Sequence, residues 1–214
     1  MSEKLTVRVW DPLVRIFHWS LVICFAVAYL TGEEESDVHI YVGYAVLGLV
    51  VFRVLWGLVG TAHARFRDFV FGPGKVIAYV RSLTSRHPQY FLGHNPAAGY
   101  MIVLLLVMLL IVTLTGIKAY GVAGYGPLAQ ATEFGLLPDA MANEDDKDRR
   151  KTGSGTGGES EEEFWEEVHE VTSNFTLVLI ILHILGVIVA SRLHRENLIK
   201  AMITGKKAVR SEID

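Results

Sequence analysis

Residues 164–193 read FWEEVHEVTSNFTLVLIILHILGVIVASRL, and this stretch decides the fold. It is long and apolar enough to be a membrane-spanning helix, yet it carries two histidines, His169 and His183. They are fourteen residues apart, which is close to four helical turns, so both imidazoles leave one face of the helix about 21 Å apart along its axis. One helix can therefore supply a ligand to each of two haems stacked across a membrane.

The composition points to the same class of protein. Of the 214 residues, 51% are hydrophobic and 20% are charged, and the charges lie between long apolar runs rather than being mixed evenly. The single cysteine, Cys24, lies inside an apolar run. The sequence therefore offers no disulfide framework and no CxxC or CxxCH motif, which argues against iron–sulfur, zinc-ribbon and covalent c-type haem sites.

The apolar runs predict an all-α protein, a four-helix transmembrane bundle in a single membrane domain covering residues 1–214. The predicted spans are about 13–31, 39–59, 97–117 and 164–193. No small-residue cleavage site follows the first run, so we interpret it as a retained helix rather than a signal peptide. We expect membrane lipid around the bundle and no nucleic-acid partner.

Basic residues set the expected orientation. If the N-terminus is inside, fourteen Lys and Arg lie in the inner segments and five lie in the outer loops. Basic residues gather on the cytoplasmic side of membrane proteins. The sequence therefore predicts a multi-pass protein of the bacterial inner membrane with both termini in the cytoplasm.

Four of the eight histidines fall at membrane depth, and their depths match in pairs. His39 and His169 lie at the outer ends of their spans, whereas His18 and His183 lie towards the inside. The first pair is predicted to ligate an outer haem and the second pair an inner one. Two neutral imidazoles give a six-coordinate, low-spin iron suited to electron transfer. Any one of these histidines could instead serve packing, while zinc would need further ligands clustered at one depth.

Two further residues are candidates for the inner site. Arg53 lies fourteen residues after His39 and could pair with a haem propionate, or it could extend to the inner surface. His94 lies in the Gly-His-Asn-Pro turn of residues 93–96, where an imidazole could serve quinone chemistry or only begin a helix. The other histidines in the inner loops are interpreted as solvated; they are His63, His87 and His194.

Several motifs resemble the bacterial cytochrome b561 family, which includes the b-type cytochrome subunits of nickel–iron hydrogenases. They are VWDPLVRIFHW at residues 9–19, FRVLWG at 52–57, GHNP at 93–96, the segment from His169 to His183, and HRENL at 194–198. The resemblance covers nearly all of the chain except about 125–160, so it implies nothing about the loop there.

The resemblance implies a four-helix dihaem cytochrome b with two haems b. Such a protein moves electrons between the quinone pool, ubiquinone or menaquinone, and a redox partner protein such as a cytochrome c or a hydrogenase-like enzyme. It would act as the electron-transfer subunit of an oxidoreductase system. The family's four haem histidines correspond to His18, His39, His169 and His183.

Three alternatives stay open at this point. One is a superoxide oxidase-like enzyme that passes electrons to quinone, although the acidic outer loops would repel that anion. Another is a hydrogenase membrane-anchor subunit. The third is a haemless scaffold or transporter, which the four histidines disfavour.

The acidic outer loop, about residues 139–163, is predicted to be flexible because it is rich in Asp, Glu, Gly and Ser. From 139 to 167 there are eleven acidic and four basic residues, a net charge of −7. This field could steer a basic partner such as a cytochrome c towards the outer haem. The loop could equally be a soluble tether.

Overall fold

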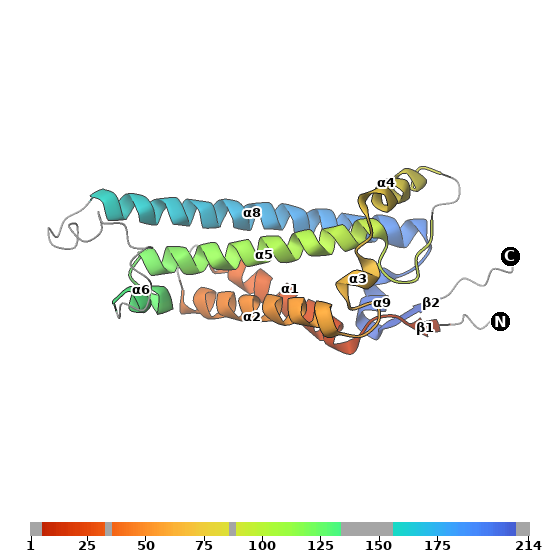
Figure 1. Ribbon diagram of the computed structural model, residues 1–214, viewed down its shortest axis with the longest axis horizontal. Coiled ribbons are helices and arrows are strands. Elements are labelled where there is room, and N and C mark those ends of the chain that lie inside the picture. The colour runs from red at the N-terminus through yellow and green to blue at the C-terminus, as the bar shows by residue number, and fades with distance from the viewer. Residues whose placement is uncertain (1–5, 33–35, 86–88, 134–155, 209–214) are drawn as a thin grey trace. The chain divides into compact units, whose positions relative to one another are not determined.

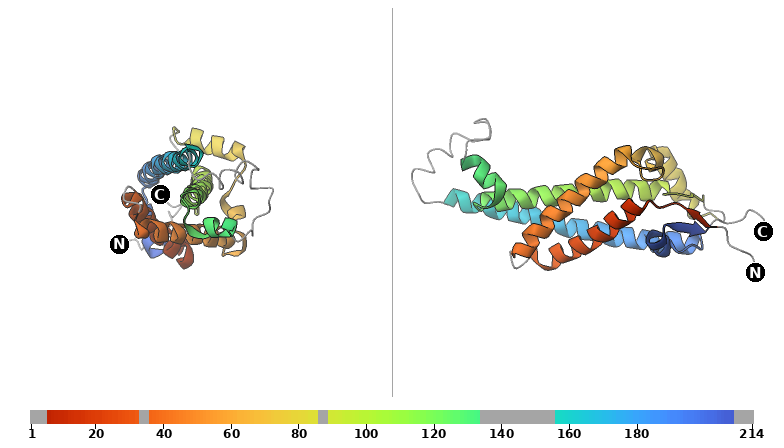
Figure 2. Two further views of the ribbon diagram at one scale, coloured as in Figure 1. Left: turned by 90° about the vertical axis from the view of Figure 1, so that its left-hand side faces the viewer. Right: turned by 90° about the horizontal axis from the view of Figure 1, so that it is seen from below.

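The computed structural model describes residues 6–32, 36–85, 89–133 and 156–208. The chain divides into two compact units: residues 1–109 together with 177–214 form the first, and residues 110–176 form the second. The boundaries between the units fall within two helices, after residues 109 and 176, and Figures 1 and 2 show the helices of the chain. His87 and most of the predicted acidic loop, residues 139–155, lie outside the described residues.

Four long helices carry the membrane spans. They are α1 (Pro12–Leu30), α2 (Asp37–Val59), α5 (Pro96–Val122) and α8 (Thr156–Leu193). Their apolar windows have a mean hydropathy of 1.9 to 2.8, and the protein buries only 11–22% of each window. Surfaces this apolar need hydrocarbon around them, and helices satisfy their own backbone there. The predicted all-α, four-span transmembrane fold is confirmed.

The fourth helix begins earlier than predicted. α8 starts at Thr156 rather than at 164, so residues 159–163 are helical and not part of a flexible loop. Within the second unit, Glu161 pairs with Lys118 of α5 at 3.4 Å. Carboxylates in the first turns of a helix also interact favourably with the positive end of its dipole. Acidity was therefore a poor indicator of disorder in this segment.

Local capping fixes where the first two helices begin. Pro12 occupies the first turn of α1, and the Asp11 carboxylate accepts a hydrogen bond from the Leu13 amide at 2.7 Å. The Ser36 hydroxyl oxygen accepts one from the amide of His39 at 3.3 Å and so caps α2. α1 and α2 pack against each other as a helical hairpin, which Figure 2 shows.

The first unit also contains short elements near the chain ends. These are α3 (Phe66–Phe69), α4 (Pro73–Ser82) and α9 (Leu198–Thr204), with strand β1 (Thr6–Arg8) pairing antiparallel to β2 (Lys206–Ala208). Thr6 lies opposite Ala208, so the first and the last strand of the described residues meet in this unit (Figure 1). The second unit contains one more short helix, α6 (Gly126–Glu133).

Backbone hydrogen bonds tie the end of α9 to the start of the chain. The amides of Val9 and Trp10 both donate to the carbonyl of Gly205, at 3.0 and 3.2 Å. Gly205 has a φ of +79°, the left-handed conformation that ends α9 and that a glycine adopts without strain. Val9, Trp10 and Ala201 form a small buried cluster beside this junction.

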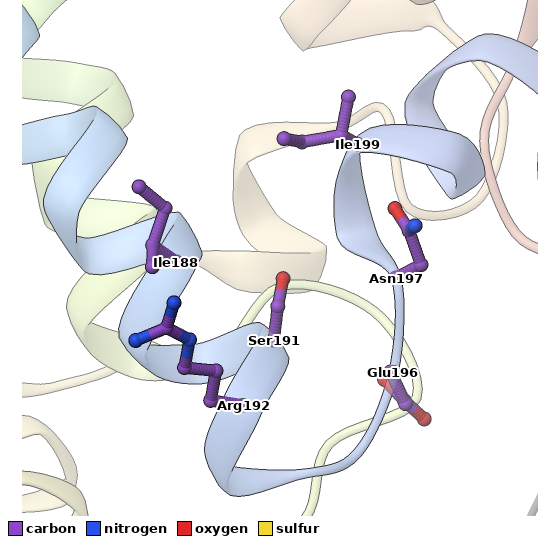
Figure 3. A pocket seen from close by; sticks show the side chains of 6 residues that line it. All are labelled: Ile188, Ser191, Arg192, Glu196, Asn197 and Ile199. Carbon is purple, nitrogen blue, oxygen red and sulfur yellow. The ribbon is translucent and has the colours of Figure 1, made fainter.

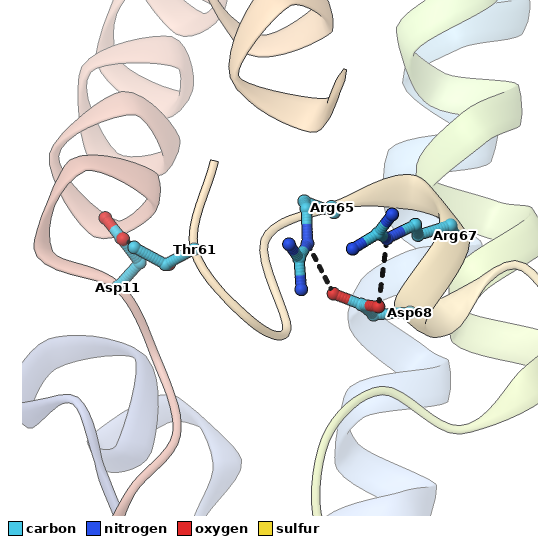
Figure 4. A network of polar contacts seen from close by, with 5 residues as sticks. All are labelled: Asp11, Thr61, Arg65, Arg67 and Asp68. Carbon is cyan, nitrogen blue, oxygen red and sulfur yellow. Dashed lines mark hydrogen bonds and ion pairs between the residues drawn. The ribbon is translucent and has the colours of Figure 1, made fainter. Parts of the chain in front are cut away.

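A polar network orders the segment after α2 (Figure 4). Thr61 donates to the second oxygen of Asp11 at 2.5 Å, which links this segment to the start of α1. Arg65 and Arg67 both approach Asp68, at 2.9 and 3.7 Å. The hydrogen bond from Arg65 is the main cause of the lowered pKa of Asp68. Ion pairs that are partly open to solvent contribute little stability, so the network mainly positions the loop.

Candidate functional site

The first unit brings the two predicted inner ligands together. His18 on α1 and His183 on α8 are both half-buried, and their imidazoles are near enough to interact electrostatically. The Nδ1 atom of His18 is buried and has no hydrogen-bond partner among the described residues. A buried polar nitrogen without a partner is costly, so this position in the membrane is unusual for a histidine that serves packing alone.

Glycines leave open space beside two of the four histidines. A Cβ atom built at Gly186, three residues after His183, would meet nothing within 4 Å. The same is true at Gly43, four residues after His39. Residues three and four apart share one helix face, so the space lies on the histidine side of each helix. The absence of a side chain at these two positions allows a flat group to approach the backbone closely.

The tautomer of His39 is set by a backbone carbonyl. Its Nδ1 atom lies 2.9 Å from the carbonyl oxygen of Ala28 on α1. A carbonyl can only accept, so Nδ1 carries a proton, and in the neutral ring the lone pair is then on Nε2. Metal-bound histidines commonly use this arrangement, in which the distant nitrogen is held and the other one faces the metal.

His169 shows the same arrangement within the second unit. Its Nδ1 atom lies 3.0 Å from the carbonyl oxygen of Val112 on α5 and 3.2 Å from the hydroxyl oxygen of Thr115. Gly116 allows this approach, because a Cβ atom there would lie 2.9 Å from Cε1 of the ring. The second unit therefore orients the His169 imidazole through α5, a role that the sequence did not reveal.

Arg53 on α2 is buried instead of extending to the surface. Only 2% of it is exposed, and its guanidinium carbon lies 5.1 Å from the ring centre of Phe66 and 5.9 Å from that of Phe69. Asp11 is near enough to interact with it electrostatically, yet Nη1 has no hydrogen-bond partner among the described residues. A buried guanidinium with an N–H group that has no acceptor is suited to bind an anionic group such as a carboxylate.

His94 lies in the same aromatic cluster, just before α5. Its ring centre is 4.4 Å from that of Trp10 and 4.7 Å from that of Phe69. Burial lowers the pKa of His94 to about 3, and the positive charge of Arg53 adds to the effect. The imidazole is therefore neutral at pH 7. It can donate one hydrogen bond and accept another, but it does not carry the additional proton of an imidazolium.

A buried ion pair near the C-terminus is a feature that the sequence did not predict. Lys207 on β2 meets Glu196 at 3.0 Å, with side chains 5% and 10% exposed. Lys207 also donates to the carbonyl of Phe91 at 2.8 Å, and the hydroxyl of Tyr90 donates to Glu196 at 2.8 Å. Burial and then this carboxylate raise the pKa of Tyr90.

One of the inner-loop histidines belongs to this cluster. His194 is half-buried, and its ring centre is 5.9 Å from that of Tyr90, so it is not freely solvated as predicted. Burial lowers its pKa.

These observations define the class of protein. Three membrane helices, α1, α2 and α8, carry the four imidazoles. Carbonyl oxygens hold the Nδ1 atoms of His39 and His169, and pairs of imidazoles from neighbouring helices are the protein ligands that a haem iron takes in a helix bundle. Within the described residues, no group of three or more His, Cys, Asp or Glu side chains could hold a metal ion directly. The arrangement is that of a membrane cytochrome b.

The chain belongs to the prokaryotic cytochrome b561 family, whose model matches residues 9–205. As a member, it is a multi-pass membrane protein that binds haem b and transfers electrons with a partner. The predicted family resemblance is confirmed over most of the chain.

Named relatives agree with this assignment. The chain is 22% identical to a probable Ni/Fe-hydrogenase B-type cytochrome subunit of Rhizobium leguminosarum bv. viciae, over 99% of this chain and 93% of the relative. A protein of the same description from Bradyrhizobium diazoefficiens is 23% identical over 96% and 87%. The probable Ni/Fe-hydrogenase 1 B-type cytochrome subunit of Escherichia coli K12 is 27% identical over 59% and 67%. No solved structure matches the chain.

Proposed function

We propose that the protein carries electrons across the bacterial inner membrane through two haems b, between the quinone pool and a redox partner. The quinone is ubiquinone or menaquinone. The relatives named as hydrogenase cytochrome subunits favour a hydrogenase-like partner over a cytochrome c. The electrostatic proximity of His18 and His183 in the first unit is the observation that carries the proposal, because two neighbouring imidazoles can serve as the two protein ligands of one haem.

The four histidines divide into two ligand pairs. His18 and His183 hold the inner haem, and His39 and His169 hold the outer one, as their places along the spans require. Haem b supplies a one-electron couple when bound, and the protein tunes it through axial ligation, burial and hydrogen bonding. The carbonyls of Ala28 and Val112 contribute by holding Nδ1–H of His39 and His169, which orients each ring and makes Nε2 more basic.

Gly116 is the residue whose replacement tests the seating of His169. Gly116→Ala places a methyl group 2.9 Å from the ring, so the imidazole must turn or α5 must move. We expect a shifted α-band and midpoint potential for the outer haem with the inner haem unchanged, measured by redox titration of the purified protein. Gly121→Ala, on the same helix, is the control. Equal shifts in both variants, or none in Gly116→Ala, would show that the contact does not position a ligand.

Both termini are assigned to the cytoplasm. The pairing of β1 with β2 supports placing both ends of the chain on one side, and the excess of basic residues in those segments favours the inner side. A reporter that is active only in the cytoplasm, fused after Asp214, is expected to work. Activity of a periplasm-only reporter at the same position would reverse the assignment.

The quinone site is assigned to the aromatic cluster at the inner haem. His94 is neutral there and can donate to or accept from a quinone oxygen, and Arg53 supplies a buried positive charge. The same arginine could serve a haem propionate. These roles for Arg53 predict different defects when it is changed.

His94→Ala is expected to slow reduction of the haems by a quinol analogue while haem content stays normal. Stopped-flow absorbance measures the rate, and His194→Ala is the matched control. If Arg53→Gln loses the inner haem or shifts its spectrum, Arg53 is a partner of a haem propionate. If haem content stays normal and reduction is slow, Arg53 is a partner of the quinone. An unchanged rate in His94→Ala removes that residue from the quinone site.

A further inference from the structure

Two grooves flank α9 in the first unit, and the proposed electron transfer uses neither. The first has a volume of about 400 Å³ and is lined by Arg15 and Trp19 of α1 together with Ile203 of α9. The second has a volume of about 250 Å³ and lies at the bend between α8 and α9 (Figure 3), where Arg192 and Ile199 line it. We call them the α9 grooves. Each groove combines an arginine of a long helix, α1 or α8, with an isoleucine of α9.

α9 has the character of a helix at a membrane surface. Ile199 and Ile203 are 52% and 54% exposed and lie four residues apart, so they share one face about 6 Å apart along the axis. Ala201 is buried on the side that faces the protein. A short helix that exposes two isoleucines and is flanked by basic residues suits the boundary between headgroups and acyl chains.

The arginine side chains that line the grooves can still donate hydrogen bonds to a ligand. Arg15 lines the first groove and donates from only one of its two terminal nitrogens to the carbonyl of Ile203, while its Nε is buried. Arg192 is exposed in the second groove. The one acid that lines a groove, Glu196, is already engaged by Lys207 and therefore does not neutralise Arg192. Both grooves thus favour an anion, and guanidinium groups match phosphate well.

An apolar track leads away from the first groove along α1. Ile16 and Ile23 both line this groove, are 64% and 63% exposed, and lie seven residues apart on one helix face. Trp19 lies between them, and tryptophan is enriched at the interface between membrane and water. A ligand that fills this site has an anionic head at Arg15 and an apolar tail along the two isoleucines.

We propose that the α9 grooves bind the phosphate headgroup of an anionic phospholipid in the leaflet on the side of the chain ends. Basic pockets at the membrane surface between helices bind such headgroups. A quinone shares the apolar tail, but its head carries no charge to pair with Arg15 and Arg192. The bound lipid would fix α9 to the membrane surface and support the junction of β1, α9 and β2.

The test measures lipid retained by the purified, haem-loaded protein, using native mass spectrometry. Phosphatidylglycerol and phosphatidylcholine are offered at equal concentration. We expect preferential retention of phosphatidylglycerol, with the affinity of one lipid site reduced about fivefold by Arg15→Gln and that of the other by Arg192→Gln, and with the first site largely recovered in Arg15→Lys. The control is Arg81→Gln, which removes an exposed arginine of α4 that lines neither groove. Arg192 is itself exposed, so its variant remains informative if Arg15→Gln folds poorly.

Several results would overturn the proposal. Equal retention of both lipids by the unaltered protein would show that the grooves do not select charge. An equally large loss in Arg81→Gln would show a general surface effect instead of a site. An uncharged short-chain quinone that binds in an Arg15-dependent manner, without phosphatidylglycerol binding there, would assign the first groove to quinone.

Discussion

Replacing His18 or His183 with alanine is expected to remove one and the same haem and leave the other in place. These two imidazoles are near enough to interact electrostatically in the first unit, and in the proposed pairing the loss of either one removes one of the two protein ligands of the same haem. His39→Ala and His169→Ala are expected to remove the other haem. Each variant should therefore lose about half of the bound haem, the largest change expected of any substitution in the chain.

The measurement is haem per protein, together with the reduced-minus-oxidised spectrum of each variant. His63→Ala and His194→Ala are the matched controls, since both histidines lie in the first unit and neither is assigned to a haem. Two spectral phenotypes should emerge, one for each ligand pair. If His39→Ala and His183→Ala share a single phenotype, the assignment of ligands to haems is wrong.

Glu196→Ala is expected to destabilise the junction of the chain ends strongly. It leaves the ammonium of Lys207, which is 5% exposed, without its carboxylate partner and also removes the acceptor of the Tyr90 hydroxyl. Breaking one partner of a buried ion pair typically costs about 3–5 kcal/mol. The loss should be local, since Lys207 belongs to β2, which pairs only with the short strand β1 among the described residues.

Hydrogen exchange of residues 198–208 in detergent measures this loss directly. The exchange rate of the β2 amides should rise sharply in Glu196→Ala, while the amides of α1 and α2 stay protected. The double variant Glu196→Leu with Lys207→Met removes both charges and should recover much of the protection, because an apolar pair can replace a buried ion pair. Equal exchange in the single variant and the unaltered protein would show that the pair contributes little.

The sequence predicted the membrane helices well because their signal is local. A run of apolar residues of sufficient length has one stable structure in lipid, so α1, α2 and α5 begin and end within a few residues of the predicted spans. The start of α8 was wrong for a local reason as well. Acidic composition indicates solvation, but it does not distinguish a charged helix from a flexible loop.

The features that were missed all depend on distant residues. β1 and β2 have three residues each and pair Thr6 with Ala208, so no periodicity within either strand reveals them. The contact of Gly116 with His169 and the ion pair of Glu196 with Lys207 are likewise products of tertiary packing. The burial of Arg53 belongs to the same group, since sequence alone allowed it to extend to the surface. The spacing along the sequence was enough to identify the four histidines as candidate haem ligands. The carbonyl groups that hold His39 and His169 could be found only in the structure.

The most direct test of the account counts the haems and identifies their ligands in one preparation. Haem b per chain is measured by the pyridine haemochrome assay, and the spin state of the oxidised iron is measured by electron paramagnetic resonance. Two haems per chain, both low-spin with two axial imidazoles, are predicted from His18, His39, His169 and His183. A single haem per chain, or a high-spin signal from a fully loaded protein, would contradict the central claim.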